Sequence, residues 1–229
     1  MAKTIRDYYK ILLLSQSGKG KTYSAINLDP ETTGFINAED KPMPFAAKFK
    51  YHAKPRRYAG VMRALEDYSK NPEIKCIFLD SFSAFSDLLL EEMRANFRGF
   101  DIWSNYNTKI GELVKLIKRA EKEVIVTGHY EILNIEGSGE KRAKLKAKEW
   151  EGVLEKEFTI VLYADSKFKD NRNEYYFLTA GDGLSAKCPP MIFGEGVTKI
   201  PNDSKFVLDK VVEFARKSEV VNSDDEVFS

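Results

Sequence analysis

Cysteine is scarce in this chain, which has only Cys76 and Cys188 among its 229 residues. Cys76 stands inside an apolar run that predicts a buried strand, so the thiols are expected to be reduced, and a disulfide-stabilised secreted scaffold is excluded. No apolar run approaches the roughly 20 residues that a membrane-spanning helix needs. Residues 1–7 also lack the apolar core of a signal peptide. We therefore expect a soluble protein of the cytoplasm.

An excess of charge of one sign is also missing, since 36 Lys and Arg residues face 35 Asp and Glu residues. Global charge therefore predicts neither a nucleic-acid binder nor a membrane binder, and either role would have to come from local clusters. We find no internal repeat and no low-complexity block. A chain of this length, 43% hydrophobic, suffices for one sizeable core. We expect one domain over residues 1–217 and an acidic, disordered tail over residues 218–229.

The most informative stretch is an apolar run, Tyr9–Leu14, that leads into a loop of small residues. The loop, residues 15–22, reads Ser-Gln-Ser-Gly-Lys-Gly-Lys-Thr. A buried strand, such a loop and then a helix are typical of a phosphate-binding P-loop, because successive backbone N–H groups can surround a phosphate. The full pattern begins with glycine, and Ser15 stands in that place. An ordinary turn between a strand and a helix is the alternative.

Within this P-loop, Lys21 is expected to reach the β- and γ-phosphates, and Thr22 to place its hydroxyl on Mg²⁺. The residues predicted to contact the nucleotide are Ser17, Gly18, Lys19, Gly20, Lys21, Thr22 and Tyr23.

Apolar runs and helical patterns alternate along the chain. The predicted strands cover residues 9–14, 34–39, 74–81 and 123–129, and the predicted helices cover residues 21–27, 56–69, 82–97 and 105–122. Residues 158–163 and 174–178 predict a β-hairpin, and the last helix is expected to end at Arg216. This order predicts an α/β fold with a mostly parallel sheet flanked by helices and an antiparallel C-terminal extension.

Each predicted parallel strand ends in a chemically active residue, at the edge of the sheet where ligands bind. Asp80 is expected to hold Mg²⁺ together with Thr22, although a carboxylate that caps the next helix is the alternative. Glu39 is the candidate for orienting or deprotonating the attacking water, with Asp40 as its competitor and a solvated acidic turn as the other reading. His129 is a candidate sensor of the γ-phosphate, or a structural histidine.

Together these motifs resemble the RecA-like core P-loop ATPases over about residues 8–215. The resemblance rests on residues 15–22, Phe35-Ile-Asn-Ala-Glu-Asp40, Ile77-Phe-Leu-Asp-Ser81 and Val124-Ile-Val-Thr-Gly-His129. It looks closest to the small bacteriophage RecA-like proteins that assist single-strand annealing and recombination, which residues 186–190 and 200–203 also resemble. It implies a RecA-like core, ATP and Mg²⁺ as cofactors, Glu39 as the catalytic glutamate, and the host cytoplasm as the location of a phage-encoded protein.

The densest basic cluster follows His129, where the resemblance implies a loop that contacts DNA. Its members are Lys141, Arg142, Lys144, Lys146 and Lys148. Cations on such a loop suit a phosphate backbone, with affinity from counterion release. A solvated charged surface is the alternative. A second basic stretch, residues 48–57, interleaves cations with aromatic residues, which either stack on bases or pack on the sheet.

The resemblance also implies a homo-oligomer, because RecA-like ATPases complete the active site with a cation from a neighbouring subunit. Lys187 is the predicted cation, and Lys167 and Lys169 are its alternatives. The expected function is an Mg²⁺-dependent ATPase that binds single-stranded DNA and promotes annealing or homologous recombination, with a single-strand-binding protein as a further candidate partner. A P-loop kinase for a small molecule or nucleotide, and a nucleotide-gated assembly or loader ATPase acting on proteins, remain open.

Overall fold

The computed structural model describes residues 7–135, 138–150 and 152–225. Its strands are β1 (Lys10–Ser15), β2 (Thr33–Asn37), β3 (Tyr51–Ala53), β4 (Cys76–Asp80), β5 (Glu123–Ile135), β6 (Ser138–Ala143), β7 (Ile160–Lys169), β8 (Arg172–Leu178) and β9 (Lys199–Pro201). Its helices are α1 (Tyr58–Lys70), α2 (Phe82–Asn96), α3 (Phe100–Arg119), α4 (Pro190–Phe193) and α5 (Ser204–Asp225), with short 3₁₀ helices η1 (Tyr23–Asn27), η2 (Lys148–Trp150) and η3 (Leu154–Glu157).

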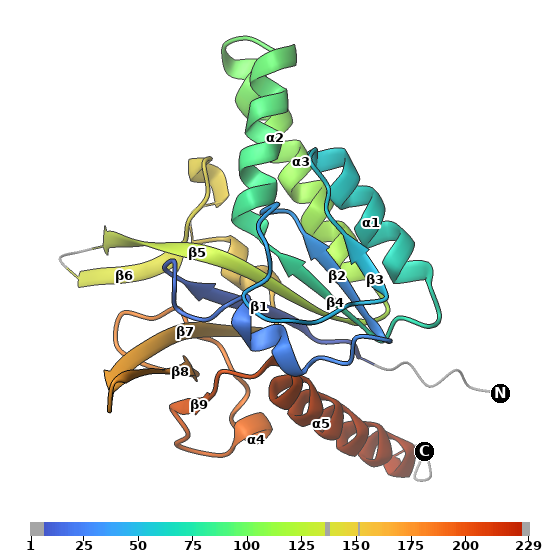
Figure 1. Cartoon of the computed structure of the whole chain (residues 1–229), viewed down its shortest axis with the longest axis vertical. Coiled ribbons are helices and arrows are strands. Elements are labelled where there is room, and N and C mark those ends of the chain that lie inside the picture. Colours follow the sequence, from blue (N-terminus) through green and yellow to red (C-terminus); the bar gives the residue numbers. More distant parts are fainter. Residues whose placement is uncertain (1–6, 136–137, 151, 226–229) are drawn as a thin grey trace.

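The strands form one mixed sheet in the order β3-β2-β4-β5-β1-β7-β8-β9, and β6 pairs with β5 off this path (Figure 1). Strands β3, β2, β4, β5, β1 and β7 run parallel, whereas β8, β9 and β6 are antiparallel to their neighbours. The predicted α/β fold, mostly parallel with an antiparallel C-terminal extension, is confirmed.

Helices cover both faces of this sheet. Helices α1, α2 and α3 lie on one face, and α5 lies on the other together with η1 (Figure 1). Each face of the sheet carries a hydrophobic core. Side chains of β1 pack alternately into one core and the other, because successive side chains of a strand point to opposite faces. Leu12 and Leu14 join the core under α1–α3, while Ile11 and Leu13 join the core under α5. Burial on both faces explains why this strand reads as a continuous apolar run.

The segment after His129 forms two paired antiparallel strands over residues 130–135 and 138–143, where a loop was expected, and its contact with DNA stays a prediction. Strand β5 continues past His129 to Ile135, and β6 returns beside it, with Tyr130 opposite Ala143 and Ile132 opposite Lys141. The aromatic and β-branched residues of this stretch favour a strand. Strand β5 therefore continues beyond the point where its partner β1 ends.

The second basic stretch, residues 48–57, contains the edge strand β3. Its aromatic residues pack rather than project, since Phe49 is buried and stacks on Phe35 with ring centroids 4.9 Å apart. Tyr51 packs edge-on against Tyr68. Packing on the sheet is therefore the reading that the structure supports for these aromatic residues.

The last helix continues past its predicted end at Arg216 to Asp225. Residues 204–225 contain no glycine or proline that would stop it. The predicted helix end at Arg216 is therefore wrong, while the disordered tail over residues 218–229 stays a prediction, and residues 226–229 lie outside the described residues. Across the described parts of the chain, every helix is too short or too polar to traverse a bilayer.

Candidate functional site

The candidate site lies at the carboxyl edge of the parallel strands, where β1 ends in the P-loop. The strand register sets Ser15 of β1 beside His129 of β5, and Asn37 of β2 beside Asp80 of β4. All seven residues predicted to contact the nucleotide line one cavity of about 590 Å³, together with Asn37, Glu39, Lys41, Pro42, Met43, Pro44, Asp80, His129 and Tyr175. This volume is in the range of small-molecule sites, so the predicted P-loop residues and strand ends converge on one site.

Two glycines give the P-loop its shape. Gly18 and Gly20 have φ angles of 76° and 87°, a left-handed conformation that residues with a Cβ rarely adopt. At Gly20 a Cβ would also lie 2.9 Å from the ring of Tyr175. The backbone therefore approaches β8 closely at this point, and glycine is required there for both reasons.

Lys21 is buried and folds back onto its own loop. Its Nζ donates to the Ser15 hydroxyl at 2.8 Å, the Ser15 carbonyl at 3.3 Å and the Gln16 carbonyl at 3.1 Å. Burial lowers the pKa of Lys21 to about 8, against the opposing charges of Asp80 and Glu39. The ammonium of Lys21 is thus hydrogen-bonded to neutral oxygens of its own loop. In a nucleotide complex, charged phosphate oxygens would take the place of these neutral acceptors.

Ser15 has a role here that the sequence pattern did not reveal. Its hydroxyl accepts the bond from Lys21 and donates to the Gln16 carbonyl at 2.7 Å. The residue that stands in place of the first loop glycine therefore holds Lys21.

The titration of Lys21 gives a prediction for nucleotide binding. We expect the affinity for Mg²⁺-ATP to be level below pH 8 and to fall by up to about tenfold per pH unit above it, because binding would then need a proton taken up by Lys21. Equilibrium titrations between pH 6.5 and 9.5 measure this profile. The control is Lys19→Ala, whose affinity should begin to fall at the same pH as that of the wild-type protein. A level affinity up to pH 9.5 would contradict it.

Asp80 is buried, with 3% of its surface exposed, and both of its oxygens are hydrogen-bonded. Oδ2 accepts from the Thr22 hydroxyl at 2.7 Å, and Oδ1 accepts from the Thr127 hydroxyl at 2.6 Å. Burial raises the pKa of Asp80 above its usual range. The cap of α2 is Ser81, whose hydroxyl accepts from the Ala84 amide, so helix capping does not account for this carboxylate.

Glu39 lies beside Asp80 and remains an anion. Its Oε1 accepts from the Ser81 hydroxyl at 2.9 Å and its Oε2 from Lys41 at 2.8 Å. Burial acts to raise the pKa of Glu39, but the bonds from Lys41 and Ser81 outweigh it and hold the pKa below its usual range. The competitor Asp40 is exposed, pairs with Arg56 at 3.3 Å, and does not line the cavity.

His129 stands between the P-loop and Glu39. Its Nδ1 lies 3.2 Å from the Ser15 carbonyl, and its Nε2 lies 4.0 Å from Glu39 Oε1. Burial, and then the charge of Lys21, lower the pKa of His129, so the ring is neutral at neutral pH. Because a carbonyl can only accept, Nδ1 carries the proton and Nε2 is left as an acceptor.

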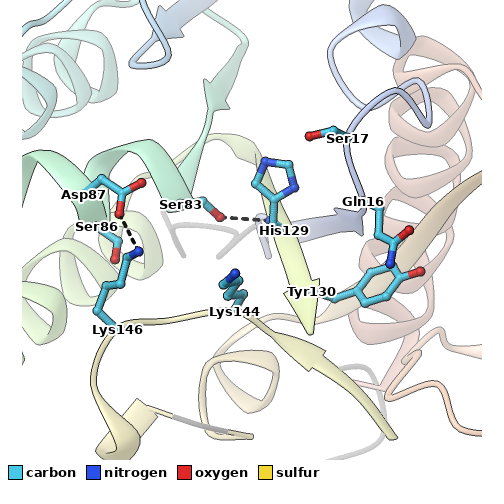
Figure 2. Close-up of a pocket in the computed structure, with 9 residues that line it drawn as sticks. All are labelled: Gln16, Ser17, Ser83, Ser86, Asp87, His129, Tyr130, Lys144 and Lys146. Carbon is cyan, nitrogen blue, oxygen red and sulfur yellow. Dashed lines mark hydrogen bonds and ion pairs between the residues drawn. The ribbon is translucent and has the colours of Figure 1, made fainter. Parts of the chain in front are cut away.

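A second cavity of about 320 Å³ adjoins the first, and His129 and Ser17 line both. Figure 2 shows Ser83, Ser86 and Asp87 on α2, with Lys146 next to Asp87 and with Lys144 between Lys146 and Tyr130. Gln16 and Tyr130 complete its lining. Lys146 pairs with Asp87 at 3.1 Å, while Lys144 is exposed.

The structure does not gather the whole basic cluster into this cavity. Lys141 lies over the ring of Tyr130 at 5.2 Å, and Arg142 pairs with Glu140 at 2.5 Å. Neighbouring residues of β6 point to opposite faces, which separates these two cations. Lys148 begins η2, and its side chain lies outside the described residues.

The predicted trans-acting cation, Lys187, lies away from the carboxyl edge. Its Nζ donates to the Phe158 carbonyl at 2.9 Å, and its backbone pairs with Val161 near the start of β7. It is thus not part of the site in its own subunit. The alternatives Lys167 and Lys169 are exposed near the other end of β7, at the edge that carries the P-loop.

One known family model covers most of the chain. Residues 7–188 match the family model described as an AAA domain. The comparison with curated proteins found no match. Among the solved structures, a KaiC-like protein from the hyperthermophilic archaeon Pyrococcus horikoshii matches with 14% identity and a TM-score of 0.48, over 74% of this chain and 77% of that one.

Proposed function

Because the chain belongs to the AAA-domain family of P-loop ATPases, we propose that it binds ATP with Mg²⁺ at the end of β1 and hydrolyses it. The convergence of Lys21, Thr22, Asp80 and Glu39 on one cavity carries this proposal. Mg²⁺-dependent release of inorganic phosphate from ATP tests it, and a purified protein that releases none would refute it.

The residues present fit a magnesium ion. Hydroxyl and carboxylate oxygens are the donors that Mg²⁺ prefers, and Thr22 Oγ1 and Asp80 Oδ2 lie 2.7 Å apart. The bound ion would neutralise charge on the phosphate oxygens. Burial raises the pKa of Asp80 even though the charge of Lys21 acts to lower it, and a bound cation would further stabilise the ionised carboxylate.

Side chains of the protein would carry out phosphate binding, activation of water and sensing of the γ-phosphate. Lys21 binds the phosphates through its ammonium, and the amides of the P-loop surround them. Glu39, ionised and held by Ser81 and Lys41, orients the attacking water and accepts its proton. His129 is the proposed sensor of the γ-phosphate, and a hydrogen bond from Nε2 to a phosphate oxygen would require the proton to be on Nε2.

Single-stranded DNA is the proposed partner, and annealing or homologous recombination the proposed process. Support comes from Lys144 and Lys146, which line a cavity that shares His129 and Ser17 with the nucleotide cavity. Phosphates of a DNA strand bound in that cavity would be separated from the site of hydrolysis by the side chain of His129 or Ser17. We propose on this basis that DNA stimulates the ATPase.

Neutralising both lysines, as Lys144→Ala with Lys146→Ala, is expected to weaken binding of single-stranded DNA. It should also flatten the slope of log K against log salt by about 1.4, since each lost phosphate contact removes about 0.7. Fluorescence anisotropy over a salt series measures both, and Lys205→Ala with Lys210→Ala on α5 is the matched control. An unchanged slope would place DNA contact elsewhere.

The same second cavity favours one other function. Its volume of about 320 Å³ has room for a small phosphoryl acceptor, as a P-loop kinase would need. A kinase would transfer phosphate to that acceptor and release little inorganic phosphate alone. Stimulation of phosphate release by DNA would exclude this alternative.

We further propose a homo-oligomer that forms on DNA, with a cation from one subunit completing the site of the next. Lys187 remains the predicted cation, and the exposed positions of Lys167 and Lys169 at the P-loop edge support them as alternatives. A phage-encoded protein of this kind would act in the host cytoplasm, where a single-strand-binding protein is a further candidate partner.

A further inference from the structure

The nucleotide cavity has an aromatic end, distinct from its phosphate end. Tyr23 of η1 and Tyr175 of β8 both line the cavity, with ring centroids 5.9 Å apart. The ring centroid of Phe45 lies 6.5 Å from that of Tyr23, and Met43 and Pro44 extend the apolar lining of the cavity. Flat apolar surfaces of this kind suit a nucleobase, which has a π-face but no charge.

Behind this aromatic end lies the Asn202 side chain. An ideal Cβ on Gly20 would be 2.9 Å from Tyr175 Cδ1, 3.1 Å from Asn202 Oδ1 and 3.2 Å from Asn202 Nδ2. The Asn202 side chain therefore lies next to Gly20 and Tyr175, two residues that line the cavity, although Asn202 does not itself line it. The amide is next to the P-loop although it is remote in sequence.

Both polar atoms of this amide, Oδ1 and Nδ2, are buried and have no hydrogen-bond partner among the described residues. An unpaired buried amide is costly, and native proteins nearly always pair such groups. The backbone around it is held in place, because Asp203 accepts from Asn27 at 2.8 Å and the hydroxyls of Ser204 and Ser24 lie 2.7 Å apart. The amide is thus fixed against the P-loop.

We propose that Asn202 reads the base of the bound nucleotide and selects adenine. The proposal rests on the proposed ATP site and includes a rotation of the Tyr175 ring, which uncovers the amide and packs on the base with Tyr23. An asparagine amide offers one donor and one acceptor, which match the N6 amino group and N7 of adenine. Guanine presents two acceptors, O6 and N7, on the same edge, so one of them would lack a donor.

The experiment compares the dissociation constants of Mg²⁺-ATP, Mg²⁺-GTP and inorganic tripolyphosphate. The wild-type protein should bind ATP about 10- to 100-fold more tightly than GTP, in line with one bidentate base contact. Asn202→Ala should lower the affinity for ATP to that for GTP and leave tripolyphosphate binding unchanged. The last readout also shows that the variant is folded, and Asn105→Ala, at a half-buried asparagine of α3 that does not line the cavity, is the matched control.

An Asn202→Ala protein that keeps the wild-type preference for ATP over GTP would overturn the assignment. So would a wild-type protein that binds tripolyphosphate but does not distinguish the two nucleotides, and in that case the phosphate site would stand. Failure of the wild-type protein to bind tripolyphosphate and both nucleotides would refute the proposed function itself, and the base site with it.

Discussion

Replacing Glu39 by glutamine is expected to lower the rate of ATP hydrolysis by about 10²- to 10⁴-fold, the usual contribution of a general base. The change keeps the shape of the side chain and its bond from Ser81, but removes the charge that accepts a proton from water. Phosphate release under saturating ATP measures the rate.

Binding of ATP should survive Glu39→Gln, because Glu39 is not among the groups that hold the phosphates. Asp40→Asn is the control, since Asp40 is exposed and pairs with Arg56 outside the cavity. Equal losses in the two variants, or full activity of Glu39→Gln, would remove Glu39 from the mechanism.

Replacing Lys21 by alanine is expected to weaken binding of ATP by about 100-fold. Its ammonium is the buried cation of the P-loop, and each charge-assisted hydrogen bond to phosphate contributes about 1.5–3 kcal/mol, so the loss of one or two accounts for the change. Titration with a fluorescent ATP analogue measures the affinity.

The matched control for Lys21→Ala is Lys19→Ala. Lys19 lies in the same loop, but it pairs with Asp165 at 2.8 Å and bonds to Ser166. Removing it should affect ATP binding far less. If Lys21→Ala bound ATP normally, the P-loop assignment would be wrong.

The strand-end residues could be predicted because burial on both faces forces a parallel strand to be apolar along its length. A polar residue such as Asp80 then marks the point where the strand leaves the sheet, and all such points meet at one edge. Glu39 follows the end of β2 and fits the same reasoning, whereas His129 lies within β5, beside the last residue of β1.

Other parts of the site depend on contacts between distant segments. Thr127 meets Asp80 because β5 pairs with β4, and Asn202 meets Gly20 because the start of α5 packs against η1. No local pattern encodes such contacts. Lys141 and Arg142 lie on a strand instead of the expected loop for a related reason, because pairing of β6 with β5 turns their side chains to opposite faces.

The most direct test of the account is the rate at which the purified wild-type protein releases phosphate from Mg²⁺-ATP, with and without single-stranded DNA, over a salt series. The account predicts Mg²⁺-dependent release that DNA accelerates, with an acceleration that shrinks as salt rises. Release that is the same with and without DNA would contradict the coupling to DNA, and no release under either condition would contradict the ATPase itself.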